Sequence, residues 1–154
     1  MSQPAKPLHT LIDLAKRRCD QAAQRLGSVM AQARDSDYKC STLAAYRDDY
    51  RARLDGAVHA GVAGADLRNF QGFLAKLEDA VRQQAAEAAH WCQTVASARQ
   101  LWQEEQTRML SYGLIEARRT LIETRDAARR EQRLQDEFAA RRRVPAGASL
   151  AFTH

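Results

Sequence analysis

The sequence is poor in the residues that interrupt helices, build aromatic cores or form strands. Of its 154 residues only 6% are aromatic, seven are glycine and three are proline, and strand-forming residues never cluster. No apolar run approaches the ~20 residues that span a bilayer. The first seven residues lack the apolar core of a signal peptide. These absences argue against a membrane-spanning protein, a secreted protein and a β-sheet fold.

The residues that bind metals or carry out catalysis are few and dispersed. The chain has three cysteines, Cys19, Cys40 and Cys92. They match neither a disulfide framework nor a metal-binding pattern, so we expect a reduced, cytosolic protein. The four histidines are scattered along the chain: His9, His59, His90 and His154. We therefore predict no metal site, no cofactor and no catalytic site, and hence a protein that is not an enzyme.

A long heptad pattern dominates the first third of the chain. Between residues 8 and 54 apolar side chains recur at alternating steps of four and three residues, interrupted only by Ser36 and Arg47. This average spacing of 3.5 residues, held over more than six heptads, is typical of a coiled coil. No proline lies between Pro7 and Pro145, so proline interrupts no helix in this range.

A second stripe of the same spacing runs between residues 70 and 116, interrupted at Gln84, Glu105 and Glu116. Three glycines at positions 56, 61 and 64 separate the two stripes. Glycine is costly inside a helix and common at its C-terminal end, so they predict a turn. We predict an all-α chain: a long antiparallel two-helix coiled-coil hairpin with an overhanging C-terminal helical extension. We expect a flexible segment at 1–7, helices at about 8–55 and 67–143, a turn at about 56–66 with Asp66 as the N-cap, and a disordered tail at 144–154.

The two stripes complement each other in size when the chain folds at the glycines. Pairing each residue i with residue 124 − i brings every stripe position against another. Trp91 then faces Ala33, and Tyr50 faces Leu74. Setting large side chains against small ones keeps the gap between two helices filled. The candidate seam residues are Leu26, Val29, Ala33, Trp91, Val95 and Trp102.

The pairing leaves the second helix longer than the first. Leu8 pairs with Glu116, so residues 117–143 have no partner within the chain. A lone helix is marginal in water, and we expect its apolar side chains to contact a partner. A frayed, solvated tail is the alternative. The candidate contact residues are Leu121, Ile122, Leu134 and Phe138.

Positive charge is concentrated in the same segment. The net charge of the chain is +5, and residues 113–143 hold nine arginines against six acidic residues. An arginine-rich helix can bind nucleic acid. However, Glu123, Asp126 and Glu131 lie among the arginines, which favours ion pairs along the helix over a phosphate-binding face. We therefore expect no nucleic-acid partner. The neighbouring acids Glu104 and Glu105 are likewise expected on a solvated helix face.

Aromatic residues that miss the stripes flank them near the predicted turn. Tyr46 and Phe73 fall within one helical turn of the same level, and Ala80 lies close by. A two-stranded coil cannot bury all of these side chains, so we expect an exposed apolar patch, a common feature of partner sites. The alternative is that these residues only widen the core.

Several segments resemble the FliJ family, small coiled-coil components of the bacterial flagellar type III export apparatus. The resemblance covers nearly the whole helical length. It is carried by residues 11–15 (Leu-Ile-Asp-Leu-Ala), 46–51 (Tyr-Arg-Asp-Asp-Tyr-Arg), 69–73 (Asn-Phe-Gln-Gly-Phe) and 136–139 (Asp-Glu-Phe-Ala). At two positions the chain departs from the family pattern, with Lys39 where a glutamine is familiar and Gln84 where a histidine is.

The resemblance implies a cytoplasmic stalk, peripheral at the inner membrane. Such a protein binds in the hexameric export ATPase, promotes its assembly and activity, contacts the cytoplasmic domain of the export gate and handles export chaperones. The resemblance implies that the gate-facing patch falls on Leu43, Tyr46, Tyr50, Phe73, Leu77 and Ala80. It also implies that the candidate contact residues of the overhanging helix meet the ATPase ring or a chaperone. The alternative functions are a generic cytoplasmic coiled-coil scaffold and a basic, nucleic-acid-associated helical protein.

Overall fold

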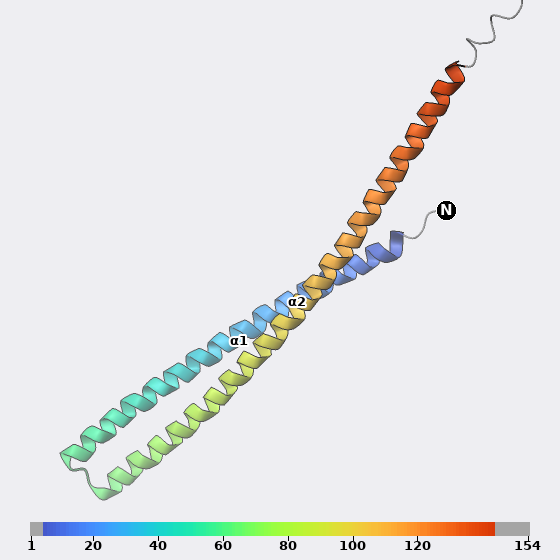
Figure 1. Cartoon of the computed structure of the whole chain (residues 1–154). Helices are drawn as coiled ribbons and strands as arrows, with labels where there is room; N and C mark the ends of the chain where they lie inside the picture. The colour runs from blue at the N-terminus through green and yellow to red at the C-terminus, as the bar shows by residue number, and fades with distance from the viewer. Residues whose placement is uncertain (1–4, 144–154) are drawn as a thin grey trace, which may run out of the picture. The chain divides into compact units, whose positions relative to one another are not determined.

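The computed structural model describes residues 5–143, and within this range the chain forms two helices. Helix α1 spans Ala5–Ala60 and helix α2 spans Gly64–Arg143 (Figure 1). The predicted all-α hairpin with a longer second helix is therefore confirmed. Pro7 lies in the first turn of α1, where the missing N–H group would have no partner in any case. The predicted disordered tail, 144–154, lies outside the described residues, as do residues 1–4.

The link between the helices is shorter than the glycine cluster predicted. Helix α1 continues through Gly56 to Ala60, and only residues 61–63 separate it from α2. Among the glycines with described backbones, only Gly61 has a positive φ, of 81°. This left-handed conformation ends a helix and favours glycine. The Gly61 amide donates to the Val58 carbonyl at 3.3 Å, which closes the last turn. The other glycines of the cluster are compatible with helix and do not break it.

Helix α2 begins before the residue that was expected to cap it. The Leu67 amide donates to the Ala63 carbonyl at 3.1 Å, so Ala63 lies at the helix start. Asp66 is inside the first turn and not at the N-cap. Its carboxylate there interacts favourably with the partial positive charge of the helix N-terminus.

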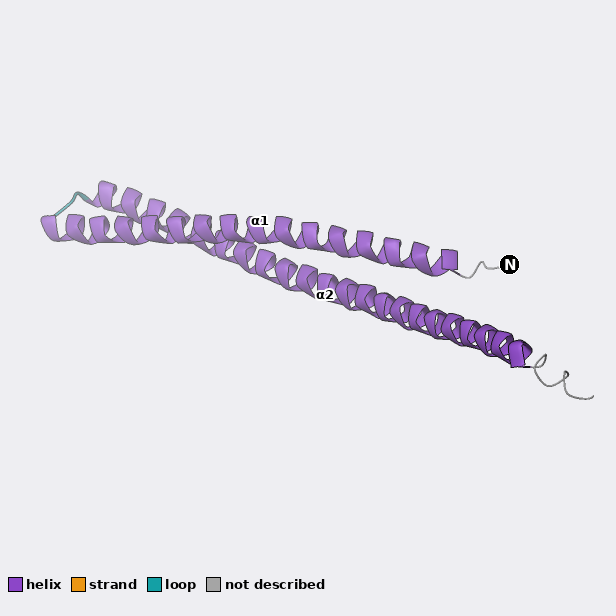
Figure 2. Ribbon diagram, turned by 90° about the horizontal axis from the view of Figure 1, so that it is seen from above, coloured by secondary structure: helices purple, strands orange, loops and turns teal. Residues whose placement is uncertain are grey.

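The described residues belong to two compact units, Asp13–Arg108 and Met1–Ile12 with Met109–His154. In the Asp13–Arg108 unit the two helices run antiparallel from the link (Figures 1 and 2). Its buried residues all lie on the two predicted stripes. They are mostly small, as expected of a narrow two-helix core: Ala15, Cys19, Ala22, Val29, Ser36, Leu54, Leu77, Val81, Ala98 and Glu105.

Contacts across the seam deviate from the predicted register on either side of it. Ser36 meets Gln84, whose Nε2 donates to the Ser36 Oγ at 3.0 Å, whereas the pairing rule assigns Ser36 to Ala88. Arg51 pairs with Glu78, five residues beyond its assigned position. These contacts deviate from the rule in opposite directions by about one helical turn, the reach of a long side chain. They are consistent with the predicted pairing. Which residues face Trp91 and Trp102 across the seam stays a prediction.

The other unit contains the beginning of α1 and the second part of α2. Ile12 is buried and Leu8 half-buried, and Met109 and Tyr112 are half-buried on α2. Between residues 113 and 143 every residue except Arg119 is exposed. The segment 113–143, here termed the overhang, is thus a helix whose residues are exposed to solvent except for Arg119.

Candidate partner-binding surfaces

The described residues offer surfaces and no cluster of reactive groups. Within residues 5–143 no group of three or more His, Cys, Asp or Glu side chains is placed to hold a metal ion. The three cysteines are free thiols, Cys19 buried, Cys40 half-buried and Cys92 exposed. No helix in the described range is long and apolar enough to cross a membrane. The candidate sites are therefore exposed apolar surfaces.

The first surface is an aromatic cluster near the link, here termed the tip patch: Tyr46, Tyr50, Phe70 and Phe73. Tyr46 is 50% exposed and Phe73 is 42% exposed. The half-buried Tyr50 ring lies 4.8 Å from the Phe73 ring and 5.7 Å from the Phe70 ring, between centroids. Tilted aromatic pairs at such distances are attractive beyond the apolar area they bury. The contact with Tyr50 therefore helps to fix the position of the Phe73 ring at the surface.

The remaining residues of the gate-facing patch implied by the resemblance differ in accessibility. Leu43 and Ala80 are half-buried, whereas Leu77 is buried in the seam. A side chain in the core cannot contact a partner directly, so Leu77 contributes by packing. Phe70 was assigned to the seam by its spacing alone. Its contact with Tyr50 shows that it also belongs to the aromatic cluster.

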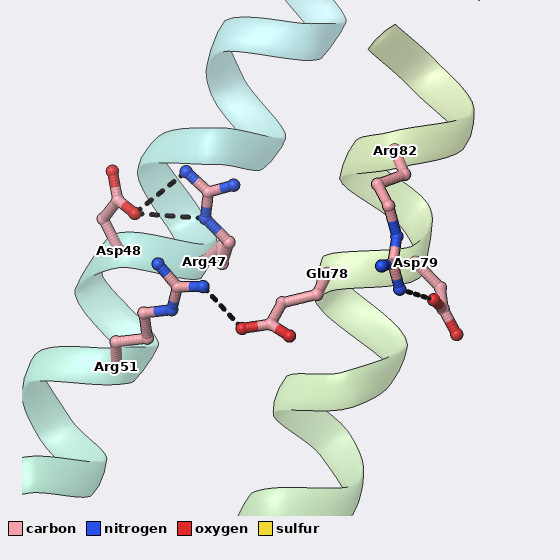
Figure 3. A network of polar contacts seen from close by, with 6 residues as sticks. All are labelled: Arg47, Asp48, Arg51, Glu78, Asp79 and Arg82. Carbon is pink, nitrogen blue, oxygen red and sulfur yellow. Dashed lines mark hydrogen bonds and ion pairs between the residues drawn. The ribbon is translucent and has the colours of Figure 1, made fainter. Parts of the chain in front are cut away.

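Charged side chains beside the tip patch are paired with one another (Figure 3). On α1, Arg47 bonds Asp48 at 3.1 Å. The Arg51 Nη2 lies 2.6 Å from the Glu78 Oε1 and so joins the two helices. On α2, Arg82 pairs with Asp79.

The hydrogen bond to Glu78 raises the pKa of the Arg51 guanidinium above its ordinary value. Both partners of this bridge are solvated, so it adds little stability. The three pairs together balance three positive charges against three negative ones. The rim of the tip patch is thus close to neutral.

A carboxylate lies buried in the seam, contrary to the expectation for the pair Glu104 and Glu105. Glu104 is exposed, but Glu105 is only 9% exposed. Its Oε1 accepts a bond from the Arg108 Nη1 at 3.0 Å, and its buried Oε2 has no partner among the described residues. Glu105 occupies a stripe position, so its place on the helix buries it although its side chain is polar. An unsatisfied buried carboxylate oxygen weakens the packing of this layer.

Replacing Glu105 by leucine is expected to raise the free energy of unfolding by about 1–2 kcal/mol, because a core position then carries an apolar side chain. Urea unfolding followed by circular dichroism at the helix band measures this change. The matched control is Glu104→Leu, at the exposed neighbouring position, which should change stability by less than about 0.5 kcal/mol. A loss of stability in Glu105→Leu would mean that the carboxylate has a stabilising partner.

The second surface is the overhang. The four predicted contact residues, Leu121, Ile122, Leu134 and Phe138, are each at least half exposed. Leu114 is the most exposed of the large apolar residues, at 73%. Leu110, just before the overhang, is also exposed and was not recognised from the sequence. Its spacing of four residues before Leu114 was the available signal.

The three acids expected to form ion pairs along the overhang form none with a described residue. Glu123 and Glu131 have no ion pair with any described residue, and Asp126 accepts a bond only through its backbone carbonyl, from the Arg130 Nε at 3.4 Å. Solvated ion pairs gain little against the entropy of two long side chains. Arg142 instead places its guanidinium 5.5 Å from the centre of the Phe138 ring, a cation–π contact. Most of the overhang arginines are therefore available to a partner.

Comparison with known proteins gives matches along nearly the whole chain. Residues 4–144 match the family described as "Flagellar FliJ protein". The chain is 31% identical to the flagellar FliJ protein of Salmonella typhi over 134 residues, covering 87% of this chain and 91% of the relative. It is 29% identical to the flagellar FliJ protein of Escherichia coli K12, with the same coverage of both chains. No solved structure gave a significant match.

Proposed function

Since the chain belongs to the flagellar FliJ protein family, we propose that it is a non-enzymatic stalk and coupling component of the bacterial flagellar protein export apparatus. It binds in the ring of the export ATPase and promotes the assembly and activity of that ring. It also links the ring to the cytoplasmic domain of the export gate and to substrate chaperones. In this function it is cytoplasmic and peripheral at the inner membrane, where the export apparatus holds it.

The observation that carries the proposal is the exposed overhang. The overhang holds six large exposed apolar side chains, from Leu114 to Phe138. Exposing so much apolar surface on a lone helix is unfavourable unless a partner covers it. Docking against a ring would bury this surface. We assign Leu121, Ile122, Leu134 and Phe138 to contacts with the ring or with a chaperone.

The tip patch is the candidate contact for the export gate. It exposes Tyr46 and Phe73, and the Phe73 ring contacts Tyr50. Aromatic side chains are enriched among the residues that dominate binding energy. Its rim consists of charge pairs that are already satisfied within the chain. Binding at the tip patch should therefore depend weakly on salt, whereas binding through the arginine-rich overhang should weaken as salt rises.

Coupling requires no chemistry in this chain. A protein that binds one state of a ring more tightly than another shifts the ring toward that state by the difference in binding free energy. The α1–α2 packing of the Asp13–Arg108 unit gives the tip patch a fixed arrangement. The overhang supplies a separate surface, so one chain can hold two partners at once.

The test is to mix the purified chain with the flagellar export ATPase and to measure both ATP hydrolysis and hexamer formation. We expect both to rise. The variant Leu134→Ser with Phe138→Ser should reduce the rise by at least about fivefold, since it removes two large exposed apolar contacts. The matched control, Leu101→Ser with Val58→Ser, changes two exposed apolar residues outside the overhang and should behave as wild type. No stimulation by the wild-type chain would refute the stalk function.

A further inference from the structure

One face of the overhang carries an uncharged stripe that is distinct from the hairpin seam. At steps of four and three residues it runs through Leu110, Leu114, Ala117, Leu121, Thr124 and Ala128, here termed the outer stripe. All six residues are exposed. The next position at this spacing is Glu131, so the uncharged stripe ends at Ala128. Two and a half heptads of apolar or small residues on one helix face form a seam that lacks a second helix.

Helix α1 does not supply this second helix. Within their unit, α1 covers the seam side of α2, where Met109 and Tyr112 are half-buried. Leu114 lies two residues beyond Tyr112, about 200° around the helix. Near Leu114 the outer stripe therefore lies on the side of α2 opposite the half-buried Tyr112.

One flank of the outer stripe is basic. Arg118 follows Leu114 by four residues, Arg125 follows Leu121 by four, and Arg129 lies one turn further on. None of these three guanidinium groups forms an ion pair with any described residue. Beside a coiled-coil seam such flanking charges determine which partner helix is accepted and in which direction. The charge that complements this flank is negative.

The same flank argues against a second copy of this chain as the occupant. In a parallel pair the arginines would face the uncharged opposite flank and gain no complementary charge. An antiparallel pair is less favourable still. In an antiparallel pair of identical stripes, equivalent flanks face each other, so Arg118 and Arg125 would meet the same arginines of the other copy. Like charges placed together at an interface are costly. A nucleic acid would match the arginines but would leave Leu114 and Leu121 against a hydrated phosphate backbone.

We propose that the outer stripe is a docking site for an amphipathic helix of a partner protein that bears acidic residues beside its apolar face. The small side chains Ala117, Thr124 and Ala128 allow the partner helix to approach closely. Leu114 and Leu121 pack against the apolar face of the partner helix, and the flanking arginines pair with the carboxylates of that helix. The outer stripe shares Leu121 with the ring or chaperone contact of the proposed function. The inference therefore deepens that function by naming the class of partner, and it rests on the proposed function in this respect.

The test uses the full-length chain and two fluorescent synthetic helical peptides of about 28 residues. Both peptides carry leucine and alanine at seam positions, one with glutamate and the other with lysine at both flanks. Fluorescence anisotropy at about 50 mM salt, where charge contacts are weakly screened, gives the affinities. The glutamate peptide should bind at least about tenfold more tightly than the lysine peptide. Leu114→Glu with Leu121→Glu should reduce its affinity by at least about tenfold, and Leu101→Glu, at an exposed leucine outside the stripe, should not.

Charge reversal separates this proposal from its competitors. In Arg118→Glu with Arg125→Glu and Arg129→Glu, the preference should change to the lysine peptide. Equal binding of both peptides by the wild-type chain would overturn the proposal. A dimer in sedimentation that the leucine substitutions abolish would assign the stripe to a second copy. Binding of a duplex DNA that depends on the arginines and is unaffected by the leucine substitutions would assign it to nucleic acid.

No ATPase is present in this assay, so its outcome is independent of the stalk test. Failure of peptide binding leaves ring stimulation untouched. Failure of ring stimulation likewise leaves the docking site untouched.

Discussion

Replacing Tyr46 and Phe73 together by alanine is expected to weaken binding to the cytoplasmic domain of the export gate by at least about tenfold. These are the two most exposed aromatic side chains of the tip patch. Truncating a central aromatic residue at an interface commonly costs about 2 kcal/mol or more. Because both side chains are solvated in the free chain, the cost should appear in binding and not in folding. Isothermal titration calorimetry of the two purified proteins measures it.

The matched control for the tip patch is Tyr38→Ala with Leu101→Ala. It removes one aromatic and one aliphatic side chain from outside the patch, Tyr38 at 71% and Leu101 at 45% exposed, so both are at least as exposed as Phe73 at 42%. Binding to the gate should remain within about twofold of wild type. Unfolding curves of both double variants should also match the wild-type curve. Equal loss of binding in the control would mean that the partner recognises the coil in general, and unchanged binding in the tip variant would remove the patch from the interface.

Trp91→Ala is expected to lower the free energy of unfolding by about 2–3 kcal/mol. Truncating a fully buried tryptophan costs about 3–5 kcal/mol, and Trp91 is half-buried on the seam. The predicted neighbour, Ala33, is too small to fill the space that remains. Urea unfolding followed by the helix signal measures the loss. The control, Gln93→Ala, changes an exposed neighbour and should have almost no effect, whereas a near-zero effect of Trp91→Ala would disprove its seam position.

Periodicity was sufficient to predict the architecture. A spacing of 3.5 residues can be read from the sequence alone. The two stripes therefore indicated both helices, their antiparallel packing and the greater length of the second helix. Every buried residue that the structure describes lies on a predicted stripe, including the polar Ser36 and Glu105. Position on the helix therefore predicted burial better than residue type did.

Local details depended on information that the pattern does not contain. The helix bounds at the link follow from backbone conformation, since Gly61 adopts a positive φ and Gly56 remains helical. Ion pairing in the overhang was overestimated, because spacing permits a contact whose net free energy is close to zero in water. The tip patch was only partly predicted. Phe70 has the spacing of a seam residue but contacts the Tyr50 ring, and Leu77 was assigned to the exposed patch but is buried in the core.

Hydrogen exchange of the full-length chain, alone and with the export ATPase, tests most directly that the overhang is a partner surface. In the free chain, amides of the two packed helices within residues 13–108 should exchange slowly, and amides of 117–143 should exchange fast. Adding the ATPase should slow exchange in 117–143 by at least about tenfold and leave residues 46–73 unchanged. Binding of the ATPase with unchanged exchange in 117–143 would contradict the account.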